Sequence, residues 1–331
     1  MQSITLRAGL EPKSRLSVLC AALKLRVRAA CRPHLTRDWL TMLNSNPTLS
    51  AIAHKEPRLL HKIYRPYLSA RLDGRQALNA LIGHYCFVLR HGLGATVLQA
   101  TRGAVELASF TGKSDTRYTL TLRAIVPMER EGELVLQLHC EQTLVLSCAF
   151  SFFSEQGKAS VGVGCLQGPQ CGEGLALTRE ATRDLHGLRP KNLMLRLVRQ
   201  LGYAYGCEQL VLVGNGNRAV ARQLRKGRVH ADYDGLWEEL GAQRRADGDY
   251  ALACTALAPL DLAEIPSKKR SEARKRQQLL EDVCEAMLVH IVPRDLTHQQ
   301  ESPLRAARVE SVMSRRRSPC RCAAHSLIEE N

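Results

Sequence analysis

The sequence predicts an α+β protein in which a basic N-terminal helical region packs on an antiparallel or mixed sheet with flanking helices. Three observations indicate this class. Apolar residues recur at helical spacing up to about residue 90, and from about residue 93 they alternate with polar residues, as in strands. After residue 170, segments with helical spacing and segments with strand-like alternation follow one another. We expect a helical region over 1–90, an α/β domain over 91–290 (a strand meander over 93–167, then a helix-strand-helix part over 170–290), and a disordered tail over 291–331.

The first ninety residues carry helical signals. A stripe at three- and four-residue spacing, interleaved with cations, predicts an amphipathic helix: Leu16, Leu19, Leu23 and Val27. We expect this stripe to dock on the protein's own core, with a membrane surface as the alternative. Pro47 and Pro57 suit the first turns of new helices, and Asp73 is placed to cap a helix that buries Leu78, Leu81 and Tyr85. His84, in the same apolar stretch, is interpreted as a core histidine.

From about residue 93 the apolar residues recur at every second position, the spacing of a β-strand. The runs TVLQAT, AVELASF, YTLTLRAIV, ELVLQLHC, TLVLSCAFSFF and ASVGVGCLQ are separated by turn-like polar stretches. This spacing predicts an antiparallel meander of five or six strands, in which TVLQAT is extended.

Helical and extended patterns then alternate. We expect a helix over 175–185, a helix beginning at Pro190, and a short buried strand at QLVLVGN. A polar helix containing Trp237 should follow, then a strand in DGDYALACTAL. A last helix should span 266–290.

Composition restricts the class of protein. The chain has 331 residues, 47 Lys+Arg against 32 Asp+Glu, and a net charge of +15, of which residues 1–90 hold most. No apolar run approaches the roughly 18 residues that span a bilayer, and no secretory signal is visible, so we expect a cytoplasmic protein. The 12 cysteines lie mostly in apolar stretches, which favours reduced thiols.

Seven blocks carry a family resemblance: HYCFVLRHGL, EGELVLQL, GCLQGP, DLHGLRPKNLM, VGNGNRAV, DYDGLWEELG and EIPSKKRSEARKRQQLLED. In this order, over about residues 35 to 290, the sequence resembles the VirK/YbjX family of Gram-negative bacteria. The resemblance implies a cytoplasmic accessory factor, acting mainly by binding a protein partner, in virulence, antimicrobial-peptide resistance, envelope remodelling or a stress (DNA-damage) response. Where Arg218 stands, that family commonly carries a histidine.

Residues 159–255 also resemble the acyl-CoA N-acyltransferase fold, in which amides at a helix start hold the cofactor pyrophosphate. A positive helix end and nearby cations suit a phosphate. The resemblance therefore predicts a site for acyl-CoA or acyl-carrier protein at Arg189, Lys191 and Asn192, with Gln167 and Asn215 nearby. The alternative is a proline-started helix with exposed basic residues.

Acidic residues near Trp237 are candidates for acid–base chemistry. Asp234 and Glu238 are one helical turn apart, so the two carboxylates are predicted to share a face and to supply a general base. His186 is a further candidate. The alternative is an ordinary acidic helix face.

A basic run lies near the end of the predicted domain. Lys268, Lys269, Arg270 and Arg274 suit contact with nucleic acid or anionic lipid, or form a solvated helix face. No hydrolase, nucleotide-binding or dinucleotide-binding motif occurs, and the C-x-C-x-x-H cluster near the end has no partner pair at zinc-finger spacing, so no metal site is predicted.

Overall fold

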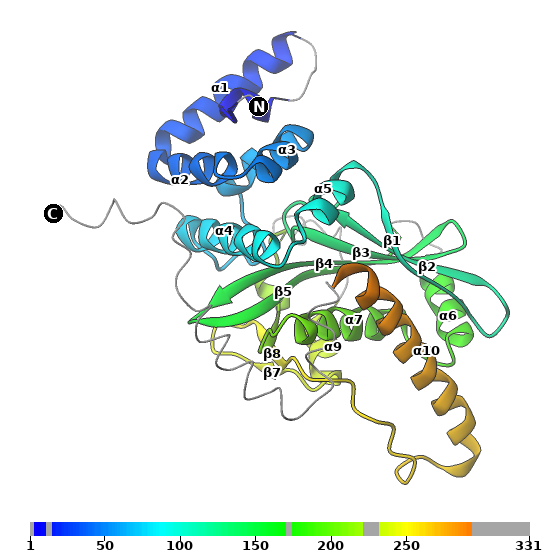
Figure 1. Cartoon of the computed structure of the whole chain (residues 1–331). Coiled ribbons are helices and arrows are strands. Elements are labelled where there is room, and N and C mark those ends of the chain that lie inside the picture. Colours follow the sequence, from blue (N-terminus) through cyan, green and yellow to red (C-terminus); the bar gives the residue numbers. More distant parts are fainter. Residues whose placement is uncertain (1–2, 11–14, 170–173, 221–231, 293–331) are drawn as a thin grey trace.

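A mixed sheet forms the centre of the protein (Figure 1). The computed structural model describes residues 3–10, 15–169, 174–220 and 232–292. Within these ranges the sheet has eight strands in the order β1-β2-β3-β4-β5-β6-β8-β7. The strands are β1 (Val105–Thr111), β2 (Arg117–Ala124), β3 (Leu134–Cys140), β4 (Thr143–Glu155), β5 (Lys158–Gln167), β6 (Gln209–Leu212), β7 (Gln243–Arg244) and β8 (Tyr250–Ala253). The α+β class is thus confirmed.

The first five strands are the antiparallel meander that the period of two predicted. Alternate residues on β2, such as Leu120 and Leu122, are fully buried. The next pair differs because β6 is parallel to β5, from Ser160 opposite Gln209 to Val163 opposite Leu212. A parallel pair requires a long crossover, and α6 (Gly174–Asp184) and α7 (Pro190–Ala204) lie in it.

Within the described ranges, six helical elements precede α5 (Gly94–Arg102) and the sheet. They are η1 (Leu6–Gly9), α1 (Arg15–Cys31), α2 (Pro33–Asn44), α3 (Pro47–Lys55), η2 (Pro57–Tyr64) and α4 (Gly74–Arg90). The predicted cap is present, since the Asp73 carboxylate accepts hydrogen bonds from the amides of Arg75 and Gln76. α4 lies close against β4, where a Cβ on Gly83 would be 3.6 Å from the Phe153 backbone.

The stretch TVLQAT is a helix, not the strand that its alternation predicted. α5 spans Gly94–Arg102 and buries Val97 and Ala100, which are three residues apart. It packs on α3 and β2. Six residues are too few for periodicity to separate a strand from a buried helical turn, and here contacts with α3 favour the helix.

The stripe on α1 does not dock on the core as expected. Leu19, Leu23 and Val27 are 65%, 65% and 53% exposed, whereas Leu25 and Ala29 are buried. Gly9 allows this docking, because a Cβ there would lie 3.2 Å from Leu25 Cδ2. The helix has two apolar stripes. η1 and α2 cover the narrower one, which contains Leu25 and Ala29. The side chain of Leu16 lies outside the described residues.

Three further helical elements follow β6 in the described part of the chain. These are η3 (Asn215–Asn217), α9 (Asp234–Glu239) and α10 (Ser267–Ile291). In Figure 1, α4 and α5 lie above the sheet, α6, α7 and α9 lie below it, and α10 packs against α7 and β1. No helix in the described ranges is long and apolar enough to cross a membrane. The tail predicted over 291–331 lies outside the described residues beyond 292.

The helical region and the sheet share one hydrophobic core, and a buried ion pair joins them. Lys62 on η2 pairs with Glu133, which precedes β3, and their side chains are 3% and 1% exposed. The second carboxylate oxygen of Glu133 accepts a 2.6 Å bond from the Tyr85 hydroxyl.

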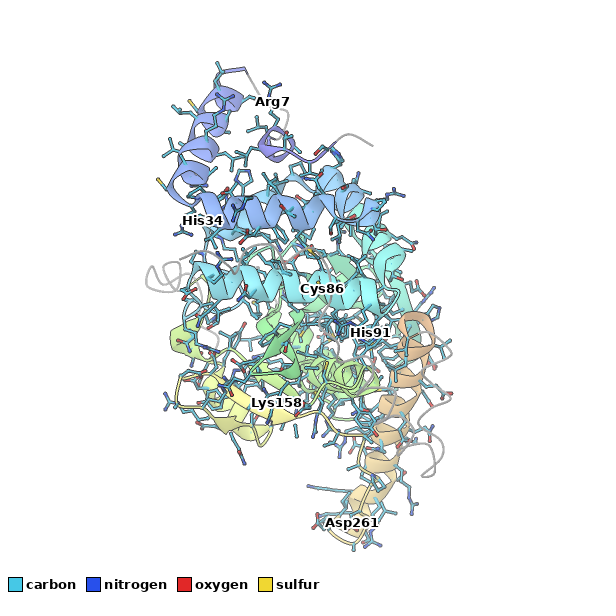
Figure 2. All side chains as sticks on the ribbon, turned by 60° about the vertical axis from the view of Figure 1, so that its left-hand side comes forward. Arg7, His34, Cys86, His91, Lys158 and Asp261 are labelled. Carbon is cyan, nitrogen blue, oxygen red and sulfur yellow. The ribbon has the colours of Figure 1, made fainter. Side chains whose placement is uncertain are left out.

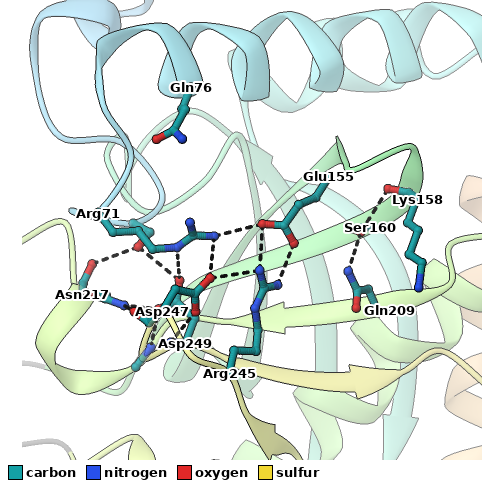
Figure 3. A network of polar contacts seen from close by, with 12 residues as sticks. Arg71, Gln76, Glu155, Lys158, Ser160, Gln209, Asn217, Arg245, Asp247 and Asp249 are labelled. Carbon is teal, nitrogen blue, oxygen red and sulfur yellow. Dashed lines mark hydrogen bonds and ion pairs between the residues drawn. The ribbon is translucent and has the colours of Figure 1, made fainter.

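A second polar network ties Arg71 to the β7–β8 hairpin (Figure 3). Arg71 contacts Asp249 at 2.9 Å, Glu155 at 3.0 Å and Asp247 at 3.2 Å. Arg245 contacts Glu155 at 2.6 Å and Asp247 at 3.0 Å. The hydrogen bonds from Arg245 and Arg71 hold the pKa of Glu155 below its ordinary value. The network therefore joins the segment before α4 to the far edge of the sheet.

Candidate anion-binding site at the start of α7

A cavity of about 720 Å³ lies between α6, the start of α7 and α9. It is lined by Thr178, Arg179, Thr182 and Arg183 from α6, by Arg189, Lys191 and Asn192 at the start of α7, and by Asp232, Gly235, Leu236 and Glu239 from the segment around α9. Its walls thus carry four cations and two carboxylates.

No side chain at the N-cap position covers the first amides of α7. Pro190 occupies the first helical position and has no N–H, and Arg189 before it makes no side-chain cap. The first amides of the helix have no intrahelical acceptor, and the helix dipole adds positive potential at this end. The cavity therefore lies where an anion is favoured.

Two cations of the wall come from α6. Arg179 and Arg183 are four residues apart, so they project from the same side of that helix, and both are exposed. Their place at the cavity could not be predicted from the sequence, because an arginine pair on a polar helix is usually solvated. The available signal was their spacing in a helix that leads into α7.

Arg189 is paired across the cavity mouth. Its Nη1 lies 3.0 and 2.8 Å from the two carboxylate oxygens of Glu239. Both side chains are more than half exposed. An ion pair this exposed contributes little stability, so a ligand phosphate can replace the carboxylate at small cost.

Asn192 adds a neutral group to the wall. Its Oδ1 is buried and has no hydrogen-bond partner within the described part of the chain. An unpaired acceptor of this kind suits an N–H or O–H of a ligand.

Asn215 positions a wall residue and does not itself line the cavity. Its Nδ2 donates to Asp232 Oδ1 at 2.7 Å, and its Oδ1 accepts from the Tyr233 amide at 2.9 Å. The hydrogen bond from Asn215 lowers the pKa of Asp232, so this carboxylate is ionised at neutral pH.

Asp234 and Glu238 are held by different partners. Asp234 Oδ1 accepts from the Asn215 amide at 2.8 Å, and Glu238 Oε1 accepts from the Tyr250 hydroxyl at 3.1 Å. Neither residue lines the cavity, so the carboxylates that face it are Asp232 and Glu239. The proposed general-base role of Asp234 and Glu238 stays a prediction.

His186 and Gln167 also lie away from the cavity wall. His186 occupies the turn after α6 with φ of 53°. Gln167 is exposed at the end of β5, in register with Ser147. Of the predicted ligand residues, Arg189, Lys191 and Asn192 lie together at the cavity, whereas Gln167 and Asn215 lie outside its lining, as does the catalytic candidate His186.

Tyr233 fills the space where β5 and β6 separate beyond Val163. Its hydroxyl accepts from the Leu166 amide at 2.8 Å and donates to the Leu166 carbonyl at 2.6 Å. Arg218 is 3% exposed, and its guanidinium carbon lies 4.1 Å from the centre of the Tyr233 ring. Burial raises the pKa of Tyr233. Arg218 therefore packs on an aromatic ring.

The basic run on α10 lies on its first turns. Lys268, Lys269 and Arg274 are exposed, and Arg270 donates to the Ile265 carbonyl at 2.9 Å. Contact of this run with nucleic acid or lipid stays a prediction. Within the described ranges, no three His, Cys, Asp or Glu residues are grouped to hold a metal, and no described cysteine forms a disulfide.

The burial of Tyr85 and His84 was predicted from the sequence, but the polar cluster that they form around Glu133 was not. Lys62, Glu133 and Tyr85 lie in one buried network, and His84 Nδ1 accepts from the Phe152 amide at 3.2 Å. The depression beside Lys62 has no internal space for a water molecule. This cluster therefore stabilises the fold and offers no room for a ligand.

These features define an α+β protein with a cationic cavity at a helix start. The chain belongs to the VirK/YbjX family: the family described as "Protein of unknown function (DUF535)" matches residues 16–288. It is similar to the uncharacterized protein YbjX of Escherichia coli K12, with 31% identity over 78% of this chain and 80% of that protein. An uncharacterized protein of Haemophilus influenzae is 24% identical over 76% of this chain and 82% of its own length. No solved structure matches the chain significantly.

Proposed function

We propose that the protein binds a phosphate-bearing ligand in the cavity at the start of α7, and that this ligand is the phosphopantetheine group of coenzyme A or acyl-carrier protein. The observation that carries the proposal is the convergence of Arg179, Arg183, Arg189 and Lys191 on one hollow at an uncapped helix start. Cations and free amides together favour a multiply charged anion.

The shape and lining of the site support this ligand class. A volume of about 720 Å³ is in the range of small-molecule and cofactor sites. Phosphates would contact the cations and the α7 amides, and the Asn192 side chain in the wall would lie beside the pantetheine arm. The carboxylates of Asp232 and Glu239 would repel a ligand that carries a further negatively charged group on their side of the cavity.

Titration calorimetry with coenzyme A, phosphopantetheine and pantetheine tests the proposal. We expect affinity to fall in that order as phosphates are removed. Arg183→Gln with Lys191→Gln should weaken coenzyme A binding by at least about 100-fold, since each of the two charge-assisted bonds that are lost contributes about 1.5–3 kcal/mol. The matched control, Lys113→Gln with Arg244→Gln, removes the same charge from exposed positions elsewhere. Equal binding of pantetheine and coenzyme A, or no binding, would refute the proposal.

A second candidate function is acyl transfer from that donor. The strand arrangement favours it, because a meander leads into a parallel pair, β5 and β6, whose crossover helix begins at the cavity. This order resembles the acyl-CoA N-acyltransferase fold. In the acyl-transfer proposal, Asp232 or Glu239 faces the reacting amine, because these are the carboxylates that line the cavity.

Release of free thiol from acetyl-coenzyme A in the presence of amines measures this activity. Loss in Glu239→Gln or Asp232→Asn, with retention in Asp234→Asn and Glu238→Gln, would support catalysis at the cavity wall. The reverse pattern would restore the prediction made from the sequence, and no release by the wild type would exclude transfer to the amines tested.

The cellular role that we propose follows the family: an accessory factor in virulence, antimicrobial-peptide resistance, envelope remodelling or the stress response. Complementation of a deletion strain tests the connection. If the cavity serves this role, Arg183→Gln with Lys191→Gln should fail to restore peptide resistance, whereas the Lys113→Gln, Arg244→Gln control should restore it.

A further inference from the structure

The outer face of α1 is an exposed apolar stripe with cations on both flanks. Leu19, Leu23 and Val27 follow one another at four-residue spacing, and each is more than half exposed. On a helix of 3.6 residues per turn, Arg26 lies on one side of this stripe and Lys24 and Arg28 lie on the other. All three cations are exposed.

The orientation of this face is fixed by the opposite side of the helix. Leu25 and Ala29 are buried against η1 and α2, so the stripe points away from the protein. α1 lies at an extremity of the molecule in Figure 1. In Figure 2, Arg7 and His34 mark this end and Asp261 marks the other. A flat surface can therefore approach α1 without meeting the sheet.

We propose that this outer face of α1 binds the surface of an anionic phospholipid bilayer. α1 contains no Asp or Glu, so every charge on the helix attracts lipid phosphates. Three aliphatic side chains in one row would enter the acyl boundary while the flanking cations stay at the head groups.

The composition of the face distinguishes a membrane from a protein groove. Protein interfaces depend on a few aromatic or arginine anchors that fill pockets. α1 has no aromatic residue, and its cations lie beside the apolar row and not within it. The face thus matches a lipid interface in both charge and arrangement.

Co-sedimentation of the full chain with vesicles tests the proposal. We expect binding to phosphatidylethanolamine–phosphatidylglycerol vesicles and not to phosphatidylcholine vesicles. The triple variant Lys24→Gln, Arg26→Gln, Arg28→Gln should bind roughly 100-fold more weakly, because each cation near an anionic surface contributes about fivefold. The pair Leu19→Ser, Leu23→Ser should lose at least about tenfold.

Matched variants control for general charge and apolarity. Lys113→Gln, Lys158→Gln and Arg244→Gln remove three exposed cations elsewhere, and Val289→Ser removes an aliphatic side chain that is 60% exposed. Both controls should bind like the wild type. Absence of wild-type binding, or equal losses in the α1 variants and the controls, would overturn the proposal.

A tryptophan at the stripe locates the contact directly. Trp39 and Trp237 are 1% and 0% exposed, so Leu23→Trp adds the one tryptophan within the described residues that reaches solvent. Its emission should shift to the blue, and brominated lipids should quench it, only with anionic vesicles. Sedimentation without this shift would assign binding to another surface and refute the role of α1.

Discussion

The buried Lys62–Glu133 pair permits a quantitative test of how the helical region is held on the sheet. In Glu133→Gln the Lys62 ammonium loses its counter-charge in a site where both side chains are almost fully buried. Breaking a buried pair from one side costs about 3–5 kcal/mol. Because folded domains are stable by only about 5–15 kcal/mol, this loss would remove a large share of the free energy of unfolding.

Equilibrium unfolding in urea measures this loss, and a double variant tests its cause. Lys62→Met with Glu133→Leu removes both charges and leaves the Tyr85 hydroxyl without its acceptor, which costs about 1–3 kcal/mol. We therefore expect the double variant to be more stable than Glu133→Gln. A Glu133→Gln cost below about 1 kcal/mol, or a double variant less stable than the single one, would refute the reasoning.

Three further predictions concern stability. Burial lowers the pKa of His84 to about 4 from its ordinary 6.5, so the unfolded chain binds the proton first and stability falls as the pH drops through this window. Of the free energy of unfolding that is lost on acidification to pH 4, about 3 kcal/mol should be absent in His84→Gln, measured by urea unfolding. If the variant loses as much stability between pH 7 and pH 4 as the wild type, His84 is not the source of the loss. Tyr233→Phe should cost about 1–3 kcal/mol by leaving both backbone groups of Leu166 unpaired, and unaltered thermal unfolding would contradict this. Asp73→Ala should cost about 1 kcal/mol, and Asp73→Asn, tested in the same melts, should retain most of the cap.

Local rules predicted the elements that depend on neighbouring residues. Pro190 begins α7 and Asp73 caps α4, because the requirements of a helix start involve only the first turn. The strand predicted for TVLQAT was wrong because six residues with three apolar positions fit either a strand or a helix. Contacts with α3, about fifty residues earlier in the chain, decide between them.

The candidate site likewise combines residues that local sequence predicted with residues that only the tertiary structure brings in. The cations at Arg189 and Lys191 were predicted because they are adjacent to the helix start, and the structure places both at the cavity. Arg179 and Arg183 join them only because α6 packs on α7, which periodicity does not show. Likewise, helical spacing identified the stripe on α1, but whether Leu23 or Leu25 is buried depends on where η1 lies.

The contact between Arg71 and Asp249 has a consequence for synthesis of the protein. These residues are 178 positions apart. At about 5–20 residues per second, a ribosome needs roughly ten to forty seconds to translate that interval. During this time the nascent N-terminal helices exist without the hairpin whose Asp247 and Asp249 contact Arg71. We therefore expect the emerging chain to depend on holding chaperones until the hairpin leaves the exit tunnel.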